Sequence, residues 1–285
     1  LAEVTWRSDP ATGSVVWVVH EGHIEQVSLS GLDEATTART LRYLTPLTRL
    51  RPLRQPDLER ALALADDLAG TSLSSRVVPA SGGYGSVLQV TGEPVRRHGG
   101  LVLDVVPMRP GHAQRLHWHE QRYGLLQAGD LVRLYATATR DPNSASSLLG
   151  GLHYRAPVGD AGGYIEMLAG NARAERGLTN TLDRSELRGR NASLAWGHPF
   201  HRDLHRYGYV IAALDHADSA ARLGVSRPRS QATALRLYVV AGQTAQDERL
   251  QQYAVTLSAG RRSNVAAGDG EKNRRGDGEG AAEVH

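Results

Sequence analysis

The sequence predicts an α+β fold in which mixed antiparallel strands accompany several helices, with one main domain over residues 1–259 and a polar tail over 260–285. Three observations support this class. Apolar residues recur every three or four positions within 199–223, which is the period of an amphipathic helix. Apolar and polar residues alternate within 234–240, which is the period of a strand. Short β-rich runs, separated by turn-forming residues, recur through the first half of the chain.

The N-terminal 30 residues are expected to form a small antiparallel β-meander. Its three β-rich runs lie at 4–7, 15–20 and 24–29. Two helices follow within about 33–70. Asp33 is a suitable cap for the first helix and Pro46 ends it, while Pro56 and Gly70 bound the second helix.

The middle of the chain, 87–138, is predicted to be rich in strands. The strands expected there and just beyond lie at 87–90, 101–106 and 131–138, while 165–169 fits a strand or a helical turn and 182–187 is ambiguous. Serine and glycine make 71–85 a predicted loop. Repeated glycines and an Asp-Pro-Asn sequence make 140–163 a predicted long surface connection.

The most regular pattern is a predicted helix–strand unit over 199–240. Its helix carries Leu204, Tyr207, Ile211 and Leu214 on one face, begins near Pro199 and ends before Gly224. A strand then covers 234–240. We expect a further helix over 244–252 and a closing strand over 253–257. The tail from 260 has almost no apolar residue, so it is predicted to be disordered or held by a partner.

Composition restricts the function classes. The chain has no cysteine, which excludes disulfides and thiolate metal sites. No apolar run approaches the about 18 residues of a membrane-spanning helix, so no membrane contact is expected. The chain starts at Leu1 without a signal-peptide pattern, which suggests a processed product or a segment of a longer polypeptide. Lys272 is the only lysine. A GC-rich genome explains this arginine preference, as does a need for phosphate contacts.

Histidines form the richest local motif. His117 and His119 project from one face of a strand, as two ligands of one metal require. Together with Gly111 they resemble the first motif of the cupins, which are metal-binding jelly rolls. Cupins place a glutamate four or five residues further on, where this chain has Tyr123 and Gly124. Glu120 is adjacent instead. The resemblance implies a metal-dependent enzyme with His117, His119 and Glu120 or a distant histidine as ligands and Fe or Mn as the metal.

Three other motifs allow both a functional and a structural interpretation. His201 and His205 have the spacing of two ligands on a helix, but Arg202 stands where a helical metalloprotease needs glutamate, so a solvated helix face is favoured. The glycine-rich loop at 81–86 leads into a strand, which is not the context of a phosphate-binding loop. A local basic patch could contact phosphates or complement a helix end; its residues are Arg222, Arg227 and Arg229.

In overall composition the chain resembles the capsid proteins of totivirus-like double-stranded RNA viruses of fungi, particularly victoriviruses. The comparable features are arginine in place of lysine and the Gly/Ala-rich ending from Ala259 to Ala282. This resemblance implies a structural virion protein that self-assembles, with copies of itself and other capsid subunits, into an icosahedral shell around RNA. The expected location is the virion and the host-cell cytoplasm, and the RNA-facing residues would be Arg222, Arg227 and Arg229.

The two leading hypotheses therefore belong to different classes. The absence of a complete catalytic motif favours the capsid subunit, which needs no cofactor, over an enzyme. The alternative is the cupin-like metal-dependent enzyme. A third hypothesis is a small-molecule or peptide-binding domain from a GC-rich bacterium.

Overall fold

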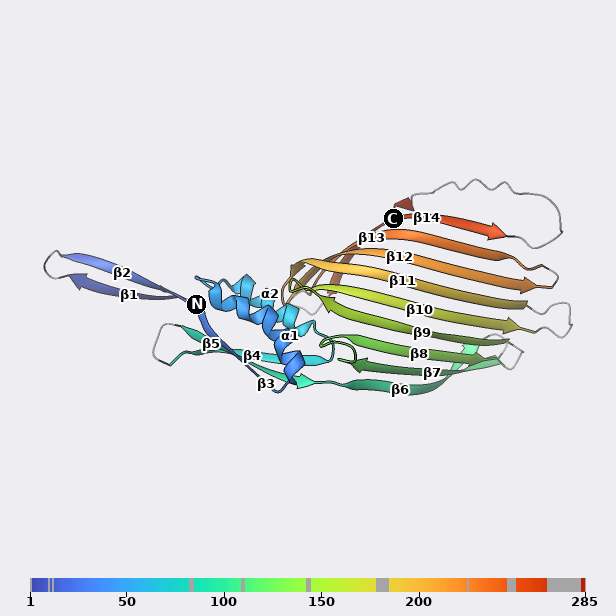
Figure 1. Cartoon of the computed structure of the whole chain (residues 1–285), viewed down its shortest axis with the longest axis horizontal. Coiled ribbons are helices and arrows are strands. Elements are labelled where there is room, and N and C mark those ends of the chain that lie inside the picture. Colours follow the sequence, from blue (N-terminus) through green and yellow to red (C-terminus); the bar gives the residue numbers. More distant parts are fainter. Residues whose placement is uncertain are drawn as a thin grey trace.

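The computed structural model describes residues 2–9, 11, 13–81, 85–108, 111–141, 145–177, 185–224, 226–244, 250–265 and 283–284. In these residues the strands form three sheets, of two, three and ten strands. Figure 1 places a hairpin at one end of the molecule, a helical unit next to it, and the ten-stranded sheet at the other end. The predicted α+β class with several helices is wrong, because strands account for most of the described chain.

The N-terminal hairpin consists of β1 (Ala2–Asp9) and β2 (Ser14–Glu21), which pair only with each other in the described residues. Trp6 lies directly opposite Trp17, and both side chains are about two-thirds exposed, at 65% and 66%. The hairpin projects away from the rest of the molecule (Figure 1). The predicted meander over 1–30 does not form, because the third strand joins a different sheet.

The helical unit has the order β-α-α-β-β. Strand β3 (Ile24–Ser30) lies parallel to β5 (Ser86–Pro94), which also pairs antiparallel with β4 (Thr71–Pro79). Helices α1 (Glu34–Leu44) and α2 (Gln55–Asp66), joined through the 3-10 helix η1 (Thr45–Arg49), cover this sheet. Together they bury a small core. The core residues with the least exposure are Ile24, Leu44, Ala65, Leu88 and Val90.

Both predicted helices of this unit are confirmed, and so is the cap of the first. The Asp33 carboxylate accepts the N–H of Thr36 at 3.0 Å, which satisfies one of the free donors at the start of α1. This hydrogen bond lowers the pKa of Asp33. The predicted loop over 71–85 is wrong in part, because 71–79 forms β4.

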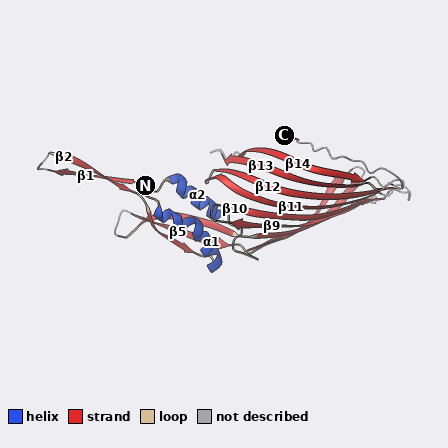
Figure 2. Cartoon of the chain, turned by 45° about the horizontal axis from the view of Figure 1, so that its top comes forward, coloured by secondary structure: helices blue, strands red, loops and turns tan. Residues whose placement is uncertain are grey.

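The ten-stranded sheet is antiparallel throughout, and each strand pairs with its neighbours in sequence. Its strands are β6 (Arg97–Met108), β7 (Gly111–Tyr123), β8 (Leu131–Arg140), β9 (Ala145–Val158), β10 (Gly163–Arg176), β11 (Ser185–Arg202), β12 (Arg206–Leu223), β13 (Arg229–Thr244), β14 (Leu250–Val265) and β15 (Glu283–Val284). Figure 2 shows that the sheet is twisted and curved. No helix in the described residues is long and apolar enough to cross a membrane.

The predicted helix over 199–223 is wrong, since these residues form the end of β11, a turn and β12. The apparent helical face is divided by the strand. Tyr207 and Ile211 lie on one side of β12, and Leu214 lies on the other with Val210 and Ala212. Several alanines in this stretch carry no strong preference for either period, which concealed the alternation.

Other expectations for this region also change. The predicted connection over 140–163 contains β9. The predicted strands at 131–138 and 253–257 are confirmed within longer strands. Of the helix expected over 244–252, residues 245–249 lie outside the described residues, and β14 begins at Leu250. The tail is a strand as far as Val265, and 266–282 lie outside the described residues.

Glycines in this sheet make room for aromatic rings from neighbouring strands. A Cβ added at Gly197 would overlap the ring of Tyr164, and one at Gly242 would overlap the ring of Tyr207. Gly151 is covered in the same way by Tyr135. Glycine at these positions lets a ring lie flat across the next strand, which is a common device in curved sheets.

We therefore expect Gly197→Ala to destabilise the sheet by about 1–3 kcal/mol, the usual range for overpacking. Urea titration of the full chain measures this change in the free energy of unfolding. Gly189→Ala is the matched control, because the nearest atom to its added Cβ is the Cβ of Ala172, at 4.0 Å. Equal effects of the two substitutions would contradict this account.

Candidate functional site

The two faces of the ten-stranded sheet differ in chemistry. Because residues alternate along each strand and the strands are in register, one face collects large apolar side chains from nine neighbouring strands. These side chains are between 39% and 71% exposed. We call them the apolar band; they are Leu101, Leu103, Val105, Leu116, Trp118, Leu134, Leu148, Leu152, Met167, Leu194, Trp196, Leu214, Leu235, Leu237, Val239, Tyr253, Val255 and Leu257.

The register makes the apolar band continuous across the strands. Leu194 on β11 is directly opposite Leu214 on β12, which is directly opposite Leu235 on β13. Leu237 on β13 is likewise opposite Leu257 on β14. A shift of one residue between any two of these strands would move one strand's apolar side chains to the other face.

The opposite face, which we call the polar face, carries charged, aromatic and small residues. Its charged and histidine side chains in the middle of the sheet are Arg115, His117, His119, Arg133, His153, Arg155, Glu166, Asp215 and Arg236. Four of them pair with one another. His153 Nε2 lies 3.2 Å from Glu166 Oε1, and Arg236 donates to Asp215 at 2.7 Å. The guanidinium of Arg155 lies over the ring of Tyr164, 3.9 Å from its centroid.

At the end of the sheet nearest the helices, three turns contact the helical unit. Arg202, at the end of β11, forms a two-point ion pair with Asp67 after α2, with N–O distances of 2.8 Å and 2.7 Å. The Tyr209 hydroxyl donates to the same carboxylate at 3.1 Å. In addition, Arg39 of α1 donates to the Gly159 carbonyl at 2.6 Å. These contacts fix the sheet to the helices.

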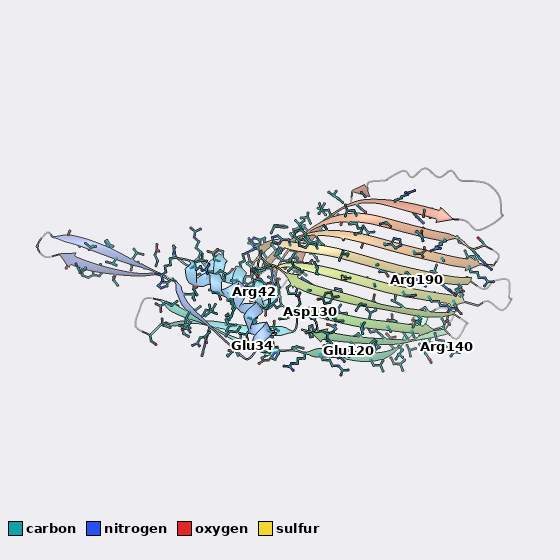
Figure 3. The ribbon with its side chains drawn as sticks, viewed as in Figure 1. Glu34, Arg42, Glu120, Asp130, Arg140 and Arg190 are labelled. Carbon is teal, nitrogen blue, oxygen red and sulfur yellow. The ribbon has the colours of Figure 1, made fainter. Side chains whose placement is uncertain are left out.

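The turn between β7 and β8 is organised by Asp130, which is fully buried. Its carboxylate accepts three successive backbone N–H groups at 2.8–3.0 Å, those of Leu125, Leu126 and Gln127. Figure 3 shows Asp130 next to the helices and Arg140 at the far end of the sheet. The turn also lines a hollow of ≈ 450 Å³ that it shares with the helical unit.

The structure brings only part of the predicted metal site together. His117 and His119 share the polar face, with ring centroids 5.6 Å apart. Glu120 projects to the opposite face, where Arg97 and Arg122 bind its carboxylate at 2.8 Å and 3.1 Å. In the described part of the chain, no three His, Cys, Asp or Glu side chains are grouped as ligands of one metal.

The second histidine cluster also changes character, because the helix that it required does not exist. His201 is in β11 and pairs with Asp203 at 3.0 Å, while His205 lies in the following turn. The three predicted RNA-facing arginines do come together, at the hairpin of β12 and β13. Arg222 ends β12, Arg227 is in the turn, and Arg229 begins β13. The apolar band is the feature that the sequence interpretation missed.

No protein-family model and no curated protein sequence matches the chain. Solved structures do resemble it. CdiB from Acinetobacter baumannii matches with a TM-score of 0.66 and 12% identity over 94% of this chain, and CdiB from Escherichia coli with 0.59 and 14% over 93%. The chain spans 50% and 58% of their respective lengths. BamA from Haemophilus ducreyi gives a TM-score of 0.42 at 9% identity.

These similarities correct the expected fold. The CdiB proteins are outer-membrane transporters of the Omp85 family, and this chain shares their β-rich fold. A capsid subunit in a virion or in host cytoplasm is therefore the wrong interpretation, and so are the associated features of a fungal double-stranded RNA virus. The cupin-like enzyme is also abandoned as the alternative function. The arginine preference that suggested a virus is equally a property of GC-rich bacterial genomes.

We expect Asp67→Asn to weaken the junction between α2 and the sheet by about 2 kcal/mol, because Arg202 would lose a charged two-point partner. Hydrogen exchange of the α2 amides, measured by mass spectrometry, should become faster. Asp160→Asn is a suitable control at the same junction, since Asp160 is 64% exposed and lies 3.9 Å from Arg39. Unchanged exchange in Asp67→Asn would show that this ion pair does not hold the junction.

Proposed function

We propose that this chain is part of an outer-membrane transporter of the Omp85 type. In this proposal the ten-stranded sheet crosses the membrane, with its apolar face against lipid and its polar face toward a water-filled interior. The β-α-α-β-β unit would be a POTRA-type domain at the membrane surface. The observation that carries the proposal is the apolar band, which is exposed and continuous over nine strands.

Contact with a lipid bilayer accounts for an apolar band that would be unfavourable in water. Soluble monomers rarely expose contiguous apolar patches of more than a few hundred Å². The apolar band also has the expected height. On β13 this face is apolar from Leu235 through Val239 of the band to Ala241, six steps that span about 20 Å, close to the apolar belt of about 25 Å on transmembrane barrels. Alternating apolar and polar residues are the sequence pattern of such strands.

The connections suggest an orientation. Outer-membrane barrels have short turns on the periplasmic side and longer loops outside. Here two connections at the end of the sheet that meets the helical unit are short, at 159–162 and 203–205, and the longer one at 124–130 is folded around the buried Asp130. We therefore place the helical unit in the periplasm. Strands β11 and β12 each have 18 residues, more than the about 9–11 that cross a bilayer, so their far ends would project beyond the outer surface.

Edge pairing is the further requirement of this proposal. In the described residues β6 pairs only with β7, and β14 pairs with β13 and the short β15. Unpaired backbone groups within lipid are unfavourable, each by several kcal/mol. We therefore propose that β6 and β14 pair with additional strands when the protein is in the membrane, and that the polar face then lines the transport path.

Tryptophan fluorescence tests the lipid contact directly. The chain has four tryptophans, and the Trp6→Phe/Trp17→Phe variant retains only Trp118 and Trp196 in the apolar band. We expect the tryptophan fluorescence of this variant to be strongly quenched in phosphatidylcholine vesicles with brominated acyl chains, relative to its fluorescence in unbrominated vesicles. The Trp118→Phe/Trp196→Phe variant is the control, because its remaining tryptophans lie in the N-terminal hairpin. Equal quenching of both variants, or of neither, would refute the proposed lipid face.

A second test of the lipid face introduces a charged side chain on either face of the sheet. We expect Leu237→Arg to reduce folding into vesicles by about 2–4 kcal/mol, because it places a charge in the middle of the lipid face. Ala234→Arg on the same strand is the matched control, since Ala234 lies on the polar face opposite Asp215. Heat-modifiable migration in gels gives the folded fraction. If Leu237→Arg folded as well as Ala234→Arg, the assignment of the two faces would be wrong.

A further inference from the structure

Beyond the apolar band, the same face ends in a belt of arginines. Moving away from the helices along β8 and along β10 to β14, the side chains of this face change from apolar to charged. On β11, for example, Trp196 and Leu194 are followed by Ala192, Arg190 and Arg188. We call these residues the arginine belt; they are Arg140, Arg173, Arg188, Arg190, Arg222, Arg229 and Arg261. Figure 3 shows Arg140 and Arg190 toward this far end.

Acidic residues in the belt hold the arginines in place without neutralising them. Among the described residues on this face and at this end of the sheet, three carboxylates accompany the seven arginines, which leaves an excess of four positive charges; they are Glu175, Glu186 and Asp218. Glu186 accepts from Arg188 at 2.6 Å and from Arg173 at 3.0 Å. Asp218 binds Arg229 at 2.8 Å and 3.0 Å.

Burial shows which charges face outward. The carboxylate side chains are 19–28% exposed, whereas those of Arg173, Arg188 and Arg229 are 51–61% exposed. Each guanidinium has five N–H donors, so an arginine that pairs with one carboxylate retains donors for a second acceptor. The belt therefore presents oriented, outward-facing donors with a net positive charge, which is the chemistry that binds phosphate.

We propose that the arginine belt binds the phosphorylated headgroups of membrane lipids in the leaflet at this end of the sheet. In a lipid, apolar acyl chains are joined directly to a charged headgroup. On this face the apolar band is likewise followed directly by the arginine belt. Arg140 is two residues beyond Ala138, which lies opposite Leu148 of the apolar band, and Arg190 is four residues beyond Leu194. The belt therefore starts about 7–13 Å past the apolar band. Arginine side chains can extend along apolar surface to reach a headgroup. The inference rests on the proposed lipid contact of the apolar band.

Bis-phosphorylated lipid A is the probe for this site, with its dephosphorylated form as the chemical control. The full chain in detergent micelles is titrated with each lipid, and bound lipid is counted by native mass spectrometry. We expect the Arg190→Gln/Arg222→Gln variant to bind the phosphorylated lipid roughly tenfold or more weakly, since charged hydrogen bonds of this kind contribute about 1.5–3 kcal/mol. Binding of the dephosphorylated lipid should not change.

The matched control is Arg176→Gln/Arg262→Gln, which removes two arginines from the same end of the sheet but from the polar face. It should bind phosphorylated lipid A as the unmodified chain does. Equal loss in both variants, or equal loss for both lipids, would overturn the proposal. So would saturation of the site by inorganic phosphate, or tighter binding of double-stranded RNA than of lipid A through Arg190 and Arg222.

The lipid A experiment can fail independently of the quenching experiment that tests the proposed function. Quenching of Trp118 and Trp196 in phosphatidylcholine vesicles requires no lipid phosphomonoester. If the quenching is present and lipid A binding does not depend on Arg190 and Arg222, only the arginine belt is wrongly assigned. If the quenching is absent, the lipid face itself is wrong.

Discussion

The antiparallel hydrogen-bond ladder is the constraint on which the rest of this structure depends. It satisfies the backbone donors and acceptors between neighbouring strands, and it also fixes the side-chain period at two. Because the register is aligned over nine strands, one choice of register sorts their side chains into an apolar and a polar face. The row through Leu194, Leu214 and Leu235 exists only because their strands are aligned in this way. Both proposed contacts, with acyl chains and with headgroups, follow from that alignment.

The two faces then use different side-chain sizes for different reasons. The apolar face carries large side chains, which suits the proposed contact with lipid chains. On the polar face, glycines and alanines alternate with aromatic rings and charged side chains. Tyr164 over Gly197 is one example. At the end near the helices, the pair of Asp67 and Arg202 fixes the sheet to a unit with a core of its own.

Much of the helical unit could be predicted from sequence, because its elements obey the usual rule that apolar residues point inward. The cap at Asp33 and both helices follow from that rule and from local capping chemistry. The large sheet does not follow this rule, because its large apolar side chains are exposed. Its polar face contains many small residues that give little hydrophobic contrast, and glycines such as Gly150 and Gly151 within β9 resemble loop residues. The alternation in 234–240 predicts one strand, but it gives no sign of the other eight strands of the sheet.

The candidate site was missed for a related reason. Side chains of the apolar band are distributed over 157 positions of sequence, from Leu101 to Leu257, and no short motif contains them. The predicted site residues were chosen as local clusters. Among these, Arg222 and Arg229 do lie together, because a hairpin turn keeps sequence neighbours close. His117 and Glu120 separate, because an odd spacing along a strand places two side chains on opposite faces.

Every strand pair in the large sheet joins strands that are consecutive along the chain. From β6 to β14 the connections are short, so closing each pair costs little entropy and no distant segment has to be found first. Assembly can advance from the helical unit one hairpin at a time, with each new strand using the exposed edge of the last as its template. The growing edge then acts both as the next folding intermediate and as the point where an interrupted chain is most vulnerable to pairing with the wrong partner.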